Sequence, residues 1–131
     1  MTHRVASCSC GQLGLTVSEE PLRVAVCHCL ACQRRTGSVF GVQARFRRAA
    51  TETSGKSSRY VRNGDEGGQA TFHFCPRCGA TVYYELDAYP DDVAVPVGAF
   101  ADPGFPPPVV SLYETRMHHW VGLPAGIERE D

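Results

Sequence analysis

The chain has 131 residues, of which 43% are hydrophobic, 21% charged and 9% aromatic, a globular composition that excludes a collagen-like, coiled-coil or wholly disordered chain. Its 13 Lys and Arg nearly balance 14 Asp and Glu, and the net charge of −1 weighs against a general nucleic-acid binder. No run approaches about 18 apolar residues, so we expect no membrane-spanning helix. We predict one domain over residues 1–131, with its core at about residues 4–123.

Short β-strands separated by Gly and Pro dominate the predicted structure, so the expected fold class is mainly β. The 13 Gly and 9 Pro interrupt runs that are rich in β-branched and aromatic residues. At most one short helix is predicted, at residues 30–35, ended by Gly37. The Asn63-Gly64 step predicts a hairpin between its flanking strands. The expected strands are residues 4–10, 12–17, 22–26, 38–46, 58–61, 69–74, 81–86 and 93–97.

Two segments near the C-terminus are expected to lack regular structure. The proline-rich stretch 102–108 predicts an extended or turning connection on the surface. Residues 126–131 predict a frayed end.

Seven cysteines in three local clusters are the strongest signal in the sequence. The N-terminus lacks the apolar stretch of a secretory signal, so we expect a cytoplasmic protein whose thiols stay reduced. An odd number of thiols cannot pair completely, and clustered cysteines in a reducing compartment are typical metal ligands. The three clusters are Cys8-x-Cys10, Cys27-x-Cys29-x-x-Cys32 and Cys75-x-x-Cys78.

Four plus three ligands would use every cysteine. Four thiolates close a structural zinc site, whereas three leave the open fourth position of a catalytic site. Spacing leaves two alternatives open: a closed site of the first four cysteines with Cys32 joining the last pair, or one four-thiolate zinc beside three unliganded thiols. Iron is a possible ion at thiolate sites, but zinc is preferred. Our preferred grouping is a structural zinc held by Cys8, Cys10, Cys75 and Cys78 and an open zinc held by Cys27, Cys29 and Cys32.

The cysteine motifs occur in an order that resembles a known family. Residues 27–41 read Cys-His-Cys-Leu-Ala-Cys-Gln-Arg-Arg-Thr-Gly-Ser-Val-Phe-Gly, residues 8–11 read Cys-Ser-Cys-Gly, and residues 74–79 read Phe-Cys-Pro-Arg-Cys-Gly. These motifs, with the aromatic-rich residues 112–120, resemble the glutathione-dependent formaldehyde-activating enzyme (GFA) family, also called the centromere protein V (CENP-V) family. Ser111 stands where members often carry His, and Arg34 where Lys is common.

The resemblance implies both a fold and an activity. The implied fold is an Mss-four-like β-tent of short antiparallel strands around the zinc sites, with the grouping of cysteines preferred above. The implied activity is condensation of glutathione with formaldehyde to S-(hydroxymethyl)glutathione, the reverse of a carbon–sulfur lyase reaction. The implied cofactor is Zn2+, two per chain.

From this we hypothesise a zinc-dependent carbon–sulfur lyase-type enzyme that acts on a small-thiol adduct. The alternatives are the same fold acting on another thiol or aldehyde, and a non-catalytic two-zinc binding or structural domain. We expect a small-molecule thiol such as glutathione as partner, no nucleic acid and no membrane, and a monomer or homodimer.

An open zinc would hold the substrate thiol as a thiolate by lowering its pKa from about 8.5, and the alkoxide formed on addition would need a proton. His28 is the nearest candidate donor in sequence, but a supporting or packing role is preferred for it. His73 is expected to be a strand residue with a satisfied ring, and His118 and His119 an exposed pair. The arginines that could bind the carboxylates of a peptide-like thiol are Arg34, Arg35, Arg45, Arg47 and Arg48.

Overall fold

Eleven β-strands and one α-helix form the regular structure of the described residues, 3–64 and 67–131, in the computed structural model. Met1 and Thr2, the first residues of the N-terminal stretch considered above, lie outside the described residues. The expected mainly β fold with one short helix is confirmed. The elements are β1 Arg4–Ser7, β2 Gly14–Val17, β3 Arg23–Cys27, α1 Leu30–Thr36, β4 Gly41–Arg47, β5 Thr51–Ser54, β6 Ser58–Asn63, β7 Gln69–Phe74, β8 Thr81–Leu86, β9 Asp92–Pro96, β10 Val110–Leu112 and β11 Glu128–Arg129, with 3-10 turns η1 Arg48–Ala50, η2 Val97–Phe100 and η3 Glu114–Arg116.

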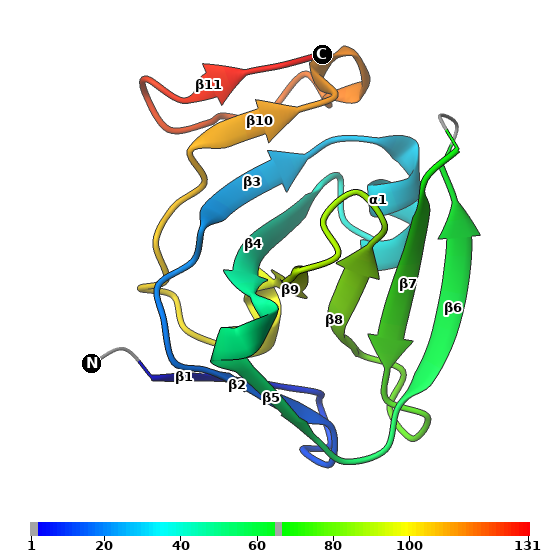
Figure 1. Cartoon of the computed structure of the whole chain (residues 1–131). Helices are drawn as coiled ribbons and strands as arrows, with labels where there is room; N and C mark the ends of the chain where they lie inside the picture. Colours follow the sequence, from blue (N-terminus) through cyan, green and yellow to red (C-terminus); the bar gives the residue numbers. More distant parts are fainter. Residues whose placement is uncertain (1–2, 65–66) are drawn as a thin grey trace.

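The strands form two sheets. The larger has eight strands in the order β11-β10-β3-β4-β9-β8-β7-β6, and the smaller has three in the order β1-β2-β5. The large sheet curves from β11 and β10 at the top of Figure 1 to β6 at the right, and the small sheet lies at its base. The short helix α1 connects β3 to β4 and lies beside the upper ends of β7 and β8 in this view.

The main hydrophobic core joins the two sheets. Leu13, Leu15 and Val17 from the small-sheet region are fully buried against Phe46 and Val95 of the large sheet. Alternation of apolar and small or polar residues along β2 directs one of its faces into this core. A second, smaller cluster on strands β7–β9 consists of Ala70, Phe72, Tyr84 and Ala94.

The C-terminal part of the chain departs from the expectations. Residues 126–131 do not fray throughout, because Glu128 and Arg129 form β11. The Glu128 amide donates to the Val109 carbonyl at 3.1 Å, so β11 pairs with β10. Both β11 and β3 run parallel to β10, whereas the remaining pairs are antiparallel as expected.

The connection at residues 102–108 has no strand or helix, as expected, but it is not wholly on the surface. Phe105 is buried in the main core, where its ring stacks on Phe100 at 4.9 Å between centroids. In residues 3–64 and 67–131, no helix has the length and apolar character that crossing a membrane requires.

Candidate metal centres and the adjoining cavity

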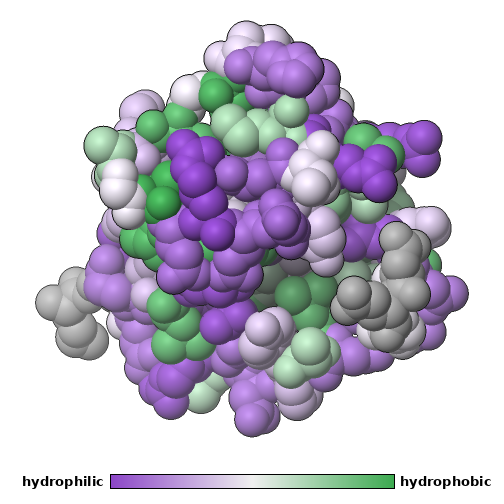
Figure 2. All heavy atoms as spheres, turned by 90° about the horizontal axis from the view of Figure 1, so that it is seen from above, coloured by the Kyte–Doolittle hydropathy of each residue, from purple (hydrophilic) through white to green (hydrophobic). Residues whose placement is uncertain are grey.

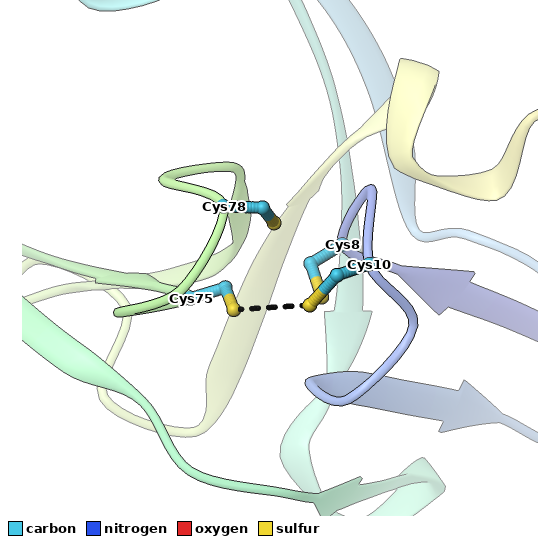
Figure 3. A group of neighbouring side chains, drawn as sticks. All are labelled: Cys8, Cys10, Cys75 and Cys78. Carbon is cyan, nitrogen blue, oxygen red and sulfur yellow. Dashed lines mark hydrogen bonds between the residues drawn. The ribbon is translucent and has the colours of Figure 1, made fainter.

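Four cysteine sulfurs from two distant hairpins meet between the sheets. Cys8 and Cys10 come from the β1–β2 connection, and Cys75 and Cys78 from the β7–β8 connection. Their Sγ atoms all lie within 4.8 Å of one another. The Cys10–Cys75 pair, drawn as a dashed line in Figure 3, is 3.6 Å apart, and the Cys8–Cys10 pair is 3.7 Å apart.

The local backbone of each hairpin turns its sulfurs inward. Gly11 and Gly79 follow the second cysteine of each motif and have φ of 86° and 80°, a left-handed conformation that glycine adopts without a steric penalty. The Leu13 amide donates to Cys8 Sγ at 3.3 Å, and the Gln12 side-chain amide donates to Cys75 Sγ at 3.0 Å. Burial raises the pKa of Cys75, but the donors around its sulfur outweigh burial and lower the pKa to about 6.

The four-sulfur cluster has the dimensions of a thiolate zinc site. Zinc–sulfur bonds of about 2.3 Å in a tetrahedron place neighbouring sulfurs about 3.8 Å apart. The Cys10–Cys75 and Cys8–Cys10 separations of 3.6 and 3.7 Å fall close to this value. The cluster could therefore hold a metal ion.

A second group of three sulfurs lies at the junction of β3 and α1. Cys27 is the last residue of β3, Cys29 is the N-cap of α1 and Cys32 lies in its first turn. The extended Cys29 backbone (φ −60°, ψ 151°) lets its Sγ accept the Cys32 amide at 3.3 Å. All three Sγ atoms lie within 4.8 Å of one another, so this trio could also hold a metal ion.

Negative charge in the trio gathers on one sulfur. Hydrogen bonds from the Cys27 and Cys32 thiols lower the pKa of Cys29 to about 2. The side-chain hydrogen bonds of Cys27 with Cys29 and Cys32, together with burial, raise the pKa of Cys27. For Cys32 the bond with Cys27 lowers the pKa, but the bond with Cys29 and burial outweigh it and the pKa is raised. A bound cation could replace the two shared protons and let all three sulfurs carry charge.

The two groups are those of the preferred grouping, which spacing alone had left open. The structure does not bring the first four cysteines together, and Cys32 lies with Cys27 and Cys29 rather than with Cys75 and Cys78.

The trio lies in the wall of a cavity of about 510 Å³. Figure 2 shows a hollow on the face seen from above, with hydrophobic residues at its base and hydrophilic side chains around its rim. Strands β6, β7 and β8, helix α1 and the end of β10 contribute its lining. The lining residues that bear on the chemistry are Cys27, Cys29, Cys32, Arg35, Gln43, Arg62, Phe72, Tyr84, Asp87 and Tyr113.

Two arginines bring positive charge to the cavity. The Arg35 guanidinium lies 5.1 Å from the Phe72 ring centroid and 5.2 Å from that of Tyr84. The Arg62 guanidinium, on β6, lies 5.2 Å from the Phe72 ring centroid on the paired strand β7. Arg35 acts to lower the pKa of Cys32, and Arg62 acts in the same direction on Cys29. Among the described residues the buried Arg35 Nε has no hydrogen-bond partner.

Tyr84 is the buried phenol of the cavity. Its hydroxyl donates to Gln43 Oε1 at 2.5 Å. Burial raises the pKa of Tyr84, so the phenol stays protonated at neutral pH.

None of the four histidines considered from the sequence lines this cavity in the described chain. His28 is fully buried with its Nε2 2.9 Å from Ser111 Oγ, which agrees with a supporting or packing role. Burial lowers the pKa of His28. His73 lies 2.6 Å from Glu85 and stacks on Tyr83, as expected of a strand residue with a satisfied ring.

His118 and His119 are exposed, as expected, and His118 also lies 3.0 Å from Gln33 Oε1.

Of the five arginines proposed to bind carboxylates, the structure places one, Arg35, in the cavity lining. Arg34 is exposed. The other three form ion pairs elsewhere: Arg45 with Asp92, Arg47 with Glu19, and Arg48 with Glu85.

Arg62 was missed because no sequence motif indicated that the β6–β7 hairpin faces the trio. Tyr113 was noted only as part of the aromatic-rich C-terminal segment. Asp87, which follows β8, was missed because it belongs to no sequence motif.

Comparison with known proteins agrees with this geometry. The family model described as glutathione-dependent formaldehyde-activating enzyme matches residues 3–117. The chain therefore belongs to the GFA family.

Among solved structures, a crystal structure of a Rhodobacter sphaeroides protein from a structural genomics programme is similar, with a TM-score of 0.59 and 23% sequence identity. That similarity covers 79% of this chain and 91% of the other, and it shows a shared fold. The search of curated proteins found no match.

Proposed function

We propose that this protein is a zinc-dependent carbon–sulfur lyase-type enzyme that condenses glutathione with formaldehyde to S-(hydroxymethyl)glutathione. The observation that carries the proposal is the position of the Cys27, Cys29 and Cys32 sulfurs in the wall of a cavity of about 510 Å³. In this proposal the trio binds a zinc with an open position, and the four-sulfur cluster binds a structural zinc. Membership of the GFA family supports the same activity.

The charges of the cavity complement glutathione. Glutathione carries two carboxylates, one ammonium group and a thiol, and a cavity of this volume is within the usual range for such a ligand. Arg35 and Arg62 would bind the carboxylates through paired hydrogen bonds. Asp87, whose carboxylate also accepts the Gln69 amide at 3.2 Å, would face the ammonium group.

A zinc ion at the trio would favour the thiolate form of the substrate thiol. The positive charges of Arg35 and Arg62, which act to lower the pKa of Cys32 and of Cys29, would act in the same direction on a substrate thiol. The thiolate sulfur adds to the carbonyl carbon of formaldehyde, a carbon–sulfur bond forms, and the carbonyl π electrons move to the oxygen. Water from the open side of the cavity protonates this oxygen, and the thiol proton leaves to solvent. No oxidant or reductant is consumed.

Tyr84 orients the site rather than acting as a base. Its hydroxyl already donates to Gln43, and burial keeps it protonated. With Phe72 it forms the aromatic surface that supports the Arg35 guanidinium.

Native mass spectrometry with and without glutathione tests the metal and ligand assignments together. Two zinc ions and one bound glutathione in the wild type, with one zinc in Cys29→Ser, are expected. A single zinc in the wild type would refute the four-plus-three assignment. Two zinc ions without glutathione binding would favour a non-catalytic binding domain or another substrate.

Exchange NMR with ¹³C-formaldehyde and glutathione tests catalysis. The wild type is expected to accelerate exchange between free formaldehyde and the adduct above the rate without protein, and Cys29→Ser is expected not to. Equal exchange rates with and without the wild-type protein would refute the activity.

A further inference from the structure

Tyr113 has a backbone conformation that its side chain disfavours. Its φ of 57° and ψ of 49° lie in the left-handed region. Among the described residues, the one other non-glycine residue with a positive φ is Ala101. In this region the Cβ atom crowds the following carbonyl oxygen, and a bulky aromatic residue is a genuine outlier. Glycine would adopt the same conformation without that crowding.

The fold fixes Tyr113 beside the sulfur trio. Strand β10 pairs with β3 in a register that sets Leu112 opposite Cys27. The Leu112 carbonyl accepts the His28 amide at 3.0 Å, which extends this pairing by one step. Tyr113 is the next residue, and both it and Leu112 line the cavity. Because 51% of Tyr113 is exposed, the side chain lies at the mouth rather than in the depth of the cavity.

The turn at this position does not itself require an aromatic ring. The left-handed residue leads the chain from β10 into η3, where Glu114 forms an ion pair with Arg129 at 2.9 Å. Glycine at position 113 would make the same turn at lower conformational cost. Disfavoured backbone conformations that persist beside a cavity are typical of functional positions.

We propose that Tyr113 is a substrate-contacting specificity residue whose ring covers the thiol ligand bound at the Cys27, Cys29 and Cys32 trio. This inference rests on the proposed function of the trio. The ring would supply apolar contact area at the mouth, in addition to the charged contacts of Arg35 and Arg62 in the same lining, and would shield the reacting carbon–sulfur bond from bulk water.

Glutathione affinity and thermal stability, measured on the zinc-loaded protein, test the inference. Tyr113→Gly removes the ring and suits the backbone, and Tyr113→Phe keeps the ring. Ala101→Gly is the matched control, because it relieves the other left-handed residue outside the cavity lining. We expect about tenfold weaker glutathione binding in Tyr113→Gly, with Tm within about 5 °C of the wild type. Tyr113→Phe is expected to bind within about threefold of the wild type and Ala101→Gly to bind unchanged.

Four results are decisive. If the wild type binds glutathione and Tyr113→Gly binds it equally well, this inference alone is overturned. If the wild type binds no glutathione, the proposed function fails and the inference fails with it. A fall in Tm of more than about 10 °C in Tyr113→Gly would assign the ring to folding and also overturn the inference. Loss of binding in Tyr113→Phe as large as in Tyr113→Gly would overturn the covering role of the ring, because the contact would then depend on the hydroxyl.

Discussion

Replacement of Cys10 by Ser is expected to destabilise the zinc-loaded protein more than replacement of Cys29 by Ser. Cys10 belongs to the four-sulfur cluster, which joins the β1–β2 and β7–β8 connections, and it lies 65 positions from Cys75 in the chain. Cys29 shares its cluster only with residues 27 and 32, on one short segment. An ion at the first cluster therefore cross-links distant parts of the fold, whereas an ion at the trio links near neighbours.

Chain entropy sets the size of the difference. The relation for a covalent cross-link gives about 4 kcal/mol for closing a 65-residue loop and about 2 kcal/mol for a loop of about six residues. With an unfolding entropy of roughly 2.1 cal/mol/K per residue, 131 residues convert these values to losses in Tm of about 15 °C and about 8 °C. Exposed Cys10 makes little packing contact, so loss of the cross-link dominates its effect.

Circular-dichroism melts together with zinc analysis by mass spectrometry check this prediction. Ser9→Ala is the matched control, because Ser9 is an exposed neighbour of Cys10 that lies outside the sulfur cluster. Ser9→Ala should leave Tm and zinc content unchanged. Equal losses of Tm in Cys10→Ser and Cys29→Ser, or two zinc ions retained in Cys10→Ser, would refute the reasoning.

Three further predictions concern the packing, the pH dependence and the cavity. Gly55→Ala should cost about 2–4 kcal/mol in urea unfolding, because its Cβ would lie 1.8 Å from the Gln12 carbonyl oxygen and its φ is +89°; an unchanged midpoint would contradict this. Burial raises the pKa of Glu85, but its histidine and arginine partners outweigh burial and lower it, so this contribution to stability is present above the unfolded pKa near 4.5 and is lost as pH falls below it. Urea midpoints between pH 3 and 6 should fall less steeply on acidification in Glu85→Gln, and parallel curves would exclude this contribution. Arg62→Ala should weaken glutathione binding about tenfold by calorimetry, whereas Arg59→Ala, an exposed change on the same strand, should not; equal affinities would remove Arg62 from the site.

Local patterns predicted most of the large sheet but not its C-terminal edge. The strands at residues 69–74 and 81–86 have the expected bounds, since their β-branched and aromatic residues favour a pleated, half-buried surface. Strand β11 consists of Glu128 and Arg129, which carry no such preference. It exists because backbone groups of β10 are available beside it, as in the 2.8 Å bond from the Glu130 amide to the Ser111 carbonyl. Tertiary pairing of this kind leaves no periodic signal.

The three cysteine motifs could be recognised because each places its sulfurs within a few residues of chain, whereas the joining of two of them into the four-sulfur cluster was a preference that spacing left open. The cavity could not be predicted, because its charged residues come from separate elements of the fold: Arg35 from α1, Arg62 from β6 and Asp87 from the residue after β8. Arg34 and Arg35 were considered because they lie close to the trio in sequence, yet of these two Arg35 lines the cavity and Arg34 does not. Arg62 also lines the cavity, although it lies in the β6–β7 hairpin, about 30 residues after Cys32. Reasoning from residues close together in sequence finds site residues on one segment. It misses site residues that the order of the strands brings close in space.

Exposure does not separate the two sulfur groups, so the different roles proposed for them rest on another difference. Cys10 and Cys78 of the four-sulfur cluster are exposed, whereas Cys27 and Cys32 of the trio are buried. The trio nevertheless faces a cavity with two arginines, and it offers one sulfur fewer than a tetrahedral ion accepts. An ion held by four sulfurs has no vacant position even beside solvent, whereas one held by three can take a ligand from the cavity. The number of donors, combined with what lies opposite them, is therefore the basis for proposing that the more buried group is the reactive one.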